Sequence, residues 1–317
     1  MKGEITDHRW GGVPRFYTIA ACPKDINLRI LDDIQKCVVY LGELSKNNNE
    51  PEYGGTAFFV SVPMETVQGR SHVYLITADH NFAKIKSDDI YIRYNTRAGL
   101  AKELKTKRVE WKRPGNSIAQ GTELKDVAAL LINDKIQDGD FITIPSNMWA
   151  TENIRKTNVV GVPDEVYMVG LFTKAQGNQK NIPIVRAGTI SSVPDQKINS
   201  PYGWMDKTYL IEGRSVGGLS GSPLFVYKAD FVSGGIIHKN FLLGLMHGHW
   251  DVLENKINEA KIHIPSEDEK GVNLGIAIVI SVDEIRNFLY SEEIMKERKE
   301  IEGKIIKDEF LTTPDFK

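Results

Sequence analysis

Short runs of β-branched and aromatic residues recur along this chain of 317 residues, with turn residues between them. Signals such as Arg113-Pro114-Gly115-Asn116 and Pro201-Tyr202-Gly203 divide the runs, as in proteins built from short strands. The pattern predicts an all-β protein. The expected strands are Cys37–Leu41, Thr56–Val62, His72–Ile76, Asp89–Tyr94, Asp126–Ile132, Glu165–Leu171, Ile182–Val185, Thr208–Ile211, Pro223–Tyr227, Phe241–Met246 and Leu274–Ile280.

The composition allows two cores, because 41% of the residues are hydrophobic and the chain is long enough for two domains. We expect two antiparallel β-barrels, the first over residues 37–155 and the second over residues 156–281. Residues 1–36 form an N-terminal extension that matches no assigned element. Residues 251–271 are interpreted as an insertion between the last two strands.

The C-terminal segment, residues 282–317, is predicted to form a helix and a tail. Ser281-Val282-Asp283-Glu284 resembles a capping box, and Ile285, Phe288 and Leu289 follow it at helical spacing. The continuation to Glu302 is highly charged, and we expect it to be solvated.

Three polar residues follow one another in an order that suggests nucleophilic catalysis. Ser220 lies in Gly218-Leu219-Ser220-Gly221-Ser222-Pro223, His80 ends the run from Leu75, and Asp126 opens another apolar run. A serine hydroxyl needs an adjacent base to become a nucleophile, and the base needs an acceptor that fixes its tautomer. Histidine and aspartate fill those roles.

The chain order of these residues excludes two other arrangements of the same chemistry. Lipases and other α/β-hydrolases run Ser, Asp, His, and subtilisins run Asp, His, Ser. The lipase motif also requires a glycine two residues after the nucleophile, where this chain has Ser222.

Five elements carry a resemblance that covers most of the chain. They are the run Gly54-Gly55-Thr56-Ala57-Phe58-Phe59-Val60, the turn Thr77-Ala78-Asp79-His80, the run Asp126-Val127-Ala128-Ala129-Leu130, the loop 218–223 and Leu243-Gly244-Leu245. Together they resemble a trypsin-like (chymotrypsin-fold) serine protease, of the bacterial branch that contains HtrA-type and glutamyl endopeptidases. The resemblance implies an endopeptidase that forms an acyl-enzyme on Ser220 without a metal ion or cofactor.

The resemblance also assigns roles near the nucleophile. It implies an oxyanion hole made by the N–H groups of Gly218 and Ser220. Digestive relatives have an aspartate at the position of Leu219, where it pairs with a newly cleaved N-terminus. Leucine cannot form that ion pair, so we expect no activation of this kind.

The substrate pocket is less readable. By spacing, Arg214 falls at the floor of the primary pocket, and His247 and His249 follow the strand that lines its wall. An arginine with a histidine would suit an acidic substrate side chain. Glutamyl endopeptidases carry their histidine at the position of Met246, however, so a surface-paired Arg214 with structural histidines is the alternative.

Charge and cysteine content bound the setting. The formal net charge is -2, which predicts no general attraction to nucleic acid or to an acidic membrane. Two cysteines are too few for a secreted disulfide framework, and the first residues lack the apolar core of a signal peptide. We therefore expect a cytoplasmic protein. The resemblance to serine proteases implies a polypeptide substrate. The other histidines, His72 among them, show no metal-ligand spacing.

Two alternatives remain open at this point. One is a binding protein that keeps the protease fold and holds a polypeptide or partner without turnover. The other is an esterase that acts on small acyl substrates through the same acyl-enzyme.

Overall fold

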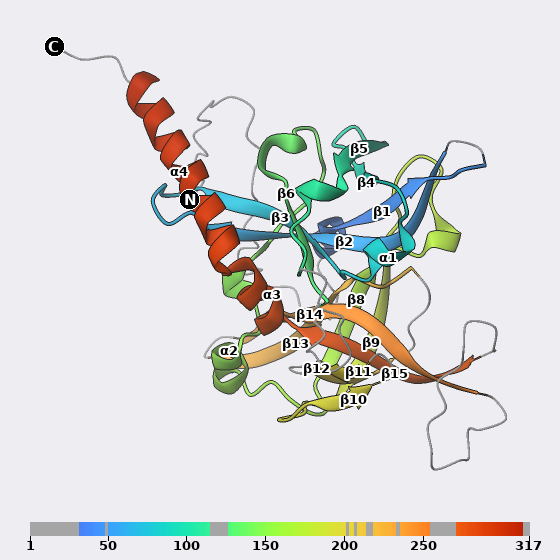
Figure 1. Ribbon diagram of the computed structural model, residues 1–317. Helices are drawn as coiled ribbons and strands as arrows, with labels where there is room; N and C mark the ends of the chain where they lie inside the picture. Colours follow the sequence, from blue (N-terminus) through green and yellow to red (C-terminus); the bar gives the residue numbers. More distant parts are fainter. Residues whose placement is uncertain are drawn as a thin grey trace.

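The computed structural model describes residues 32–47, 50–114, 126–200, 203–205, 208–213, 218–232, 235–253 and 271–312. Figure 1 shows a protein of mostly β structure, with helices at its C-terminal end. The strands are β1 (Val38–Leu44), β2 (Pro51–Pro63), β3 (Ser71–Thr77), β4 (Asp89–Asn95), β5 (Ala101–Lys107), β6 (Ala128–Leu131), β7 (Ile144–Pro145), β8 (Glu165–Gly170), β9 (Ile184–Ser192), β10 (Ile198–Ser200), β11 (Gly203–Met205), β12 (Thr208–Glu212), β13 (Pro223–Val232), β14 (Gly235–Leu253) and β15 (Gly271–Ser281). The α-helices are α1 (Asn81–Lys84), α2 (Glu152–Thr157), α3 (Val282–Leu289) and α4 (Glu292–Thr312).

Two sheets organise the chain. The first runs β5-β4-β1-β2-β3-β6, with β7 parallel to β2, and forms a half-barrel. The second closes into a barrel in the order β12-β15-β14-β13-β8-β9. The prediction of a β protein with a C-terminal helix is confirmed. The two predicted barrels are one closed barrel and one half-barrel within the described residues, and the domain boundaries stay predictions.

Alternation along the strands creates three apolar clusters. On β2, Ala57 and Phe59 face the core inside the first sheet, while Phe58 and Val60 face the second sheet. A third cluster fills the closed barrel. Strands buried on both faces need continuous apolar runs, which explains the unbroken run Ala57–Val60. The cluster that contains Phe58 and Val60 therefore lies between the two sheets and joins them.

The C-terminal segment forms two helices instead of one. Ser281 caps α3, since its hydroxyl accepts a hydrogen bond from the N–H of Asp283 at 3.1 Å. In Figure 1, α4 passes alongside β3 and extends past the first sheet. The expectation of a solvated extension was wrong for Arg298 and Glu302, which are 4% and 3% exposed. Both residues bond to the first sheet, which is why their charges are buried.

Other predictions have clear outcomes. β5 is an edge strand of the first sheet. Ile34, inside the segment interpreted as an extension, is fully buried in the cluster between the sheets, beside Cys37. Residues 254–270 of the expected insertion lie outside the described residues, and β14 already includes residues 251–253.

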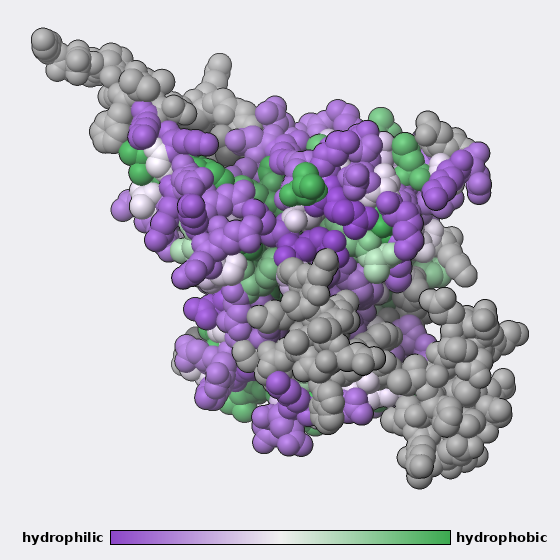
Figure 2. Space-filling view, viewed as in Figure 1, coloured by the Kyte–Doolittle hydropathy of each residue, from purple (hydrophilic) through white to green (hydrophobic). Residues whose placement is uncertain are grey.

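The surface is polar on the face shown in Figure 2, where hydrophilic side chains cover most of the described area and hydrophobic ones are scattered. Among the described residues, no helix has both the length and the apolar character needed to cross a membrane.

Candidate active site

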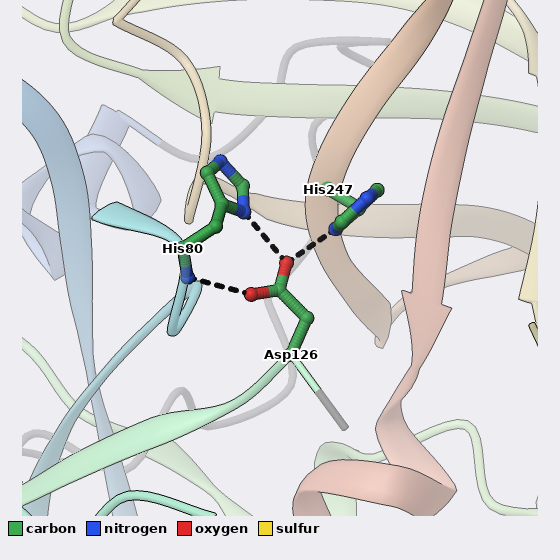
Figure 3. Close-up of side chains that lie close together, drawn as sticks. All are labelled: His80, Asp126 and His247. Atoms are coloured by element: carbon green, nitrogen blue, oxygen red, sulfur yellow. Dashed lines mark hydrogen bonds and ion pairs between the residues drawn. The ribbon is translucent and has the colours of Figure 1, made fainter. Parts of the chain in front are cut away.

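His80 and Asp126 meet because β3 and β6 pair. Thr77 at the end of β3 stands opposite Ala128 at the start of β6, so the residues just beyond the strands come together. The Nδ1 atom of His80 lies 2.8 Å from Oδ2 of Asp126, and the His80 backbone N–H donates to Oδ1 at 2.8 Å. Figure 3 shows both contacts. The two hydrogen bonds fix the imidazole relative to the carboxylate.

The electrostatics of Asp126 favour its charged form. Its side chain is 3% exposed, and this burial alone raises the pKa of the carboxyl. Hydrogen bonds from His247 and His80 outweigh burial and hold the pKa of Asp126 well below its usual range. An ionised carboxylate only accepts hydrogen bonds, so Nδ1 of each ring carries the proton. In the neutral ring of His80, Nε2 is then the atom that accepts a proton.

His247 is the second imidazole on this carboxylate. Its Nδ1 also bonds to Oδ2 of Asp126, and its side chain is 4% exposed (Figure 3). The pairing of β14 with β15 shifts register between Met246 and Gly248, which makes His247 the extra residue of a β-bulge. Bulges re-aim side chains. The bulge explains how a residue of the closed barrel reaches an aspartate of the first sheet.

The loop that carries Ser220 depends on two glycines. Gly218 has φ +93° and Gly221 has φ +85°, in the region that side chains with a Cβ disfavour. A Cβ on Gly221 would lie 2.2 Å from the carbonyl oxygen of Thr56. Glycine at these two positions therefore has a physical basis in backbone conformation and, at Gly221, in close packing.

Residues of the first sheet hold this loop in place. The Thr56 hydroxyl donates to the Gly218 carbonyl at 3.0 Å, and the Thr56 N–H donates to the Ser220 carbonyl at 3.1 Å. The side-chain amide of Asn81 donates to the same Ser220 carbonyl at 3.1 Å. Because Asn81 directly follows His80, this contact brings the serine loop beside the histidine.

The hydroxyl of Ser220 has a different partner from the one that the sequence predicts. It donates to the backbone carbonyl of His247 at 3.3 Å and, within the described part of the chain, not to the His80 ring. A hydrogen bond from this hydroxyl to Nε2 of His80 would require the Ser220 side chain to leave the His247 carbonyl.

Asp79 stands beside the histidine but is already paired. Its carboxylate accepts two hydrogen bonds from Arg113, at 2.5 and 3.1 Å, and Arg113 also lies over the ring of Phe82. Burial raises the pKa of Asp79, and the Arg113 contacts oppose that rise. Asp126 is therefore the carboxylate that contacts His80.

The three residues predicted to line the substrate pocket have different outcomes. Arg214 lies outside the described residues. His249 on β14 pairs with Asp251, its Nε2 lying 3.1 Å from Oδ2. The side chain of His247 points to Asp126, as described above. A contact of His247 or His249 with substrate stays a prediction, as does the oxyanion hole of Gly218 and Ser220.

Among the described residues, the side chains of His80, Asp126 and His247 form a group that could hold a metal ion. One ligand atom each of His80, Asp126 and His247 lies within 4.8 Å of the others. Both Nδ1 atoms, however, point at the carboxylate across hydrogen bonds that require a proton on nitrogen. A metal ion would have to replace both protons, so the observed arrangement suits proton transfer better than metal binding.

The sequence had a signal for part of what surrounds His80, Asp126 and Ser220, because Thr56 belongs to the glycine-rich run that precedes the histidine. The bond of His247 to Asp126 had no such signal, because a β-bulge leaves no mark in a run of apolar and glycine residues.

Comparisons with known proteins identify structures but no sequence relatives. No protein-family model and no curated protein matches this chain. A crystal structure of Deg5 is similar with a TM-score of 0.38 and 18% identity, over 65% of this chain and 84% of that chain. A crystal structure of the Drosophila Grass clip serine protease of the Toll pathway has a TM-score of 0.46 and 9% identity, over 86% of this chain and 74% of that chain.

Proposed function

We propose that this chain is a serine endopeptidase of the double-barrel chymotrypsin type, with Ser220 as nucleophile, His80 as base and Asp126 as its orienting carboxylate. One observation carries the proposal. Asp126 holds His80 through both the backbone N–H and Nδ1, each at 2.8 Å, while Asn81 ties the Ser220 loop beside that histidine. The arrangement leaves Nε2 of His80 as the proton acceptor.

The proposed reaction proceeds in two halves. In the first, Oγ of Ser220 attacks the peptide carbonyl carbon as its proton passes to Nε2 of His80. The amine leaves with that proton, and an acyl group remains on Ser220. In the second, water gives a proton to His80 and attacks the ester, which releases the acid and returns the proton to Ser220. We assign the N–H groups of Gly218 and Ser220 to the oxyanion.

From the sequence we further propose an acidic preference through Arg214 at the floor of the pocket, with His247 and His249 at its wall, and, from the low cysteine content, a cytoplasmic location. Arg214 would neutralise a glutamate or aspartate immediately before the scissile bond. A peptide library that shows a preference for aliphatic or basic residues there would remove the pocket assignment and leave the triad assignment intact.

The direct test is covalent labelling by a fluorophosphonate probe. We expect Ser220→Ala to abolish labelling and to lower peptide turnover by roughly a million-fold. Ser222→Ala is the matched control, because Ser222 is a buried serine two residues away. If Ser222→Ala lost labelling and Ser220→Ala kept it, Ser222 would be the nucleophile and the assignment of Ser220 would be wrong.

The base and its orienter make separate predictions. We expect His80→Ala to be as damaging as loss of the serine, and Asp126→Asn to cost about ten-thousand-fold, because asparagine favours the wrong tautomer of the histidine. If either substitution left the turnover rate unchanged, the role assigned to that residue would be wrong.

A second candidate function has one observation in its favour. The Ser220 hydroxyl is engaged with the His247 carbonyl instead of with His80, which is what a protease fold that only binds polypeptide would tolerate. Such a protein would bind peptides without labelling by the probe. If labelling occurs, a peptide library next to small esters separates an endopeptidase from an esterase.

A further inference from the structure

His247 contacts two members of the proposed triad at once. Its side chain bonds through Nδ1 to Oδ2 of Asp126, and its backbone carbonyl accepts the Ser220 hydroxyl at 3.3 Å. Its ring centroid lies 5.1 Å from that of His80, at 80° between the planes. A histidine that merely fills space in the core would not need to meet both the carboxylate and the nucleophile.

The bond to Asp126 completes the restraint on that carboxylate. Oδ1 accepts from the backbone N–H of His80, while Oδ2 accepts from the rings of both His80 and His247. Two of the three donors belong to His80 and therefore move together with that residue. The third donor, Nδ1 of His247, comes from the other sheet and holds Oδ2 independently of His80. This restraint keeps the negative charge close to Nδ1 of His80 when His80 takes up a proton.

The position of His247 is built into the backbone. It occupies the β-bulge of β14 between Met246 and Gly248, and its side chain is 4% exposed. Met246 packs inside the closed barrel, whereas Leu245 packs in the cluster between the sheets. The extra residue sends the imidazole out of the barrel and onto the carboxylate of the other sheet.

We infer that His247 is a positioning residue for the reaction, which orients Asp126 and through it the base His80. The inference rests on the proposed function and deepens it. It differs from the substrate role predicted by sequence spacing, since a positioning residue changes the rate of the chemical step and leaves substrate binding nearly unaltered.

Two substitutions isolate the hydrogen bond. In His247→Asn, the amide nitrogen stands the same number of bonds from the backbone as Nδ1 and keeps a donor for Asp126. His247→Leu has a similar shape without a donor. We expect the leucine variant to label with the fluorophosphonate probe about ten to a hundred times more slowly, because a hydrogen bond to a charged group carries a factor of that size. The asparagine variant should stay within about threefold of the natural chain.

The peptide kinetics provide a second readout. For a positioning residue, kcat falls in His247→Leu while KM stays within about twofold, and Asn restores kcat. If KM rises in both variants with kcat unchanged, His247 contacts substrate and the inference is wrong. Equal slowing of both variants, with thermal unfolding like that of the natural chain, would likewise remove the donor from its role.

Failure of the proposed function gives a different result. If the natural chain does not label, or if Ser220→Ala labels as well as the natural chain, Ser220 is not the nucleophile and the proposed function is wrong, and the His247 contact is then judged by NMR. We expect the Nδ1–H proton of His247 to resonate downfield and to shift in Asp126→Asn. A His247 signal that the Asp126 substitution leaves in place would overturn the inference whether or not the chain is an enzyme.

Discussion

Replacing Glu302 by glutamine should destabilise the fold, because this carboxylate ties α4 to the first sheet. Its side chain is 4% exposed. It accepts hydrogen bonds from the N–H of Glu65 at 3.2 Å, the N–H of Thr66 at 2.8 Å, the Thr66 hydroxyl at 2.5 Å and Nε2 of His72 at 2.9 Å. Glutamine removes the charge and puts an NH₂ group where only acceptors fit.

The size of the effect follows from the pKa of Glu302. Burial raises this pKa, but the bonds from Thr66 and His72, with those from the backbone N–H groups, lower it from 4.5 to about 2. A carboxyl whose pKa falls that far on folding contributes about 3 kcal/mol to the free energy of unfolding. The contribution is complete above pH 4.5 and is lost as the pH falls from 4.5 to 2.

His72 adds a second, higher range of acid sensitivity. Burial is the main reason that the pKa of His72 lies below 6.5. A proton on Nδ1 would have no hydrogen-bond partner among the described residues. Its contribution is present above pH 6.5 and is lost as the pH falls below it.

Urea unfolding of the natural chain and of Glu302→Gln, at pH 7 and at pH 3, measures the contribution of Glu302 to the free energy of unfolding. We expect Glu302→Gln to lose about 3 kcal/mol at pH 7 and about 1.5 kcal/mol at pH 3. Glu300→Gln is the control, because Glu300 lies on the same helix but is exposed, and it should stay within about 0.5 kcal/mol of the natural chain. A loss at pH 7 below about 1 kcal/mol, or one that does not shrink at pH 3, would refute the reasoning.

Two further predictions concern the Ser220 loop. Gly221→Ala should destabilise the fold by more than about 1 kcal/mol beyond Gly99→Ala in the same urea assay. Both glycines have positive φ, but a Cβ on Gly221 would lie 2.2 Å from the Thr56 carbonyl oxygen and a Cβ on Gly99 meets nothing within 4 Å. Asn81→Ala should slow labelling of Ser220 about tenfold, because it removes one of the two donors on the Ser220 carbonyl. Similar losses in both glycine variants, or undiminished labelling without Asn81, would contradict these assignments.

Local sequence was enough for the residues whose chemistry depends on short motifs. Strands with continuous apolar runs, such as Ala57–Val60, are readable because both faces are buried. The Ser220 loop is readable because glycine tolerates the backbone that two positive φ angles require. Ser281 as a helix cap follows from the same kind of short-range rule.

Contacts between distant segments were out of reach. Arg298 and Glu302 look solvated in a charged helix, and their partners Tyr74 and His72 lie more than 200 residues away. Propensity and periodicity describe neighbouring residues within one helix or strand. They do not indicate which hydrogen-bond partner a residue meets on a distant element. Sequence reasoning named His247 as a pocket residue but missed its contact with Asp126, because a register shift depends on the partner strand.

The contacts that hold the proposed reacting groups are also contacts between the two sheets. The hydrogen bonds from Thr56 to Gly218 and from Asn81 to Ser220 join β2, and the residues that follow β3, to the Ser220 loop. His247 reaches Asp126 across the same boundary. A change that loosens the apolar cluster between the sheets would therefore displace serine, base and carboxylate relative to one another before either sheet lost its own core. Activity in this chain should be more sensitive than secondary structure to packing between the sheets, because each sheet carries only part of the site.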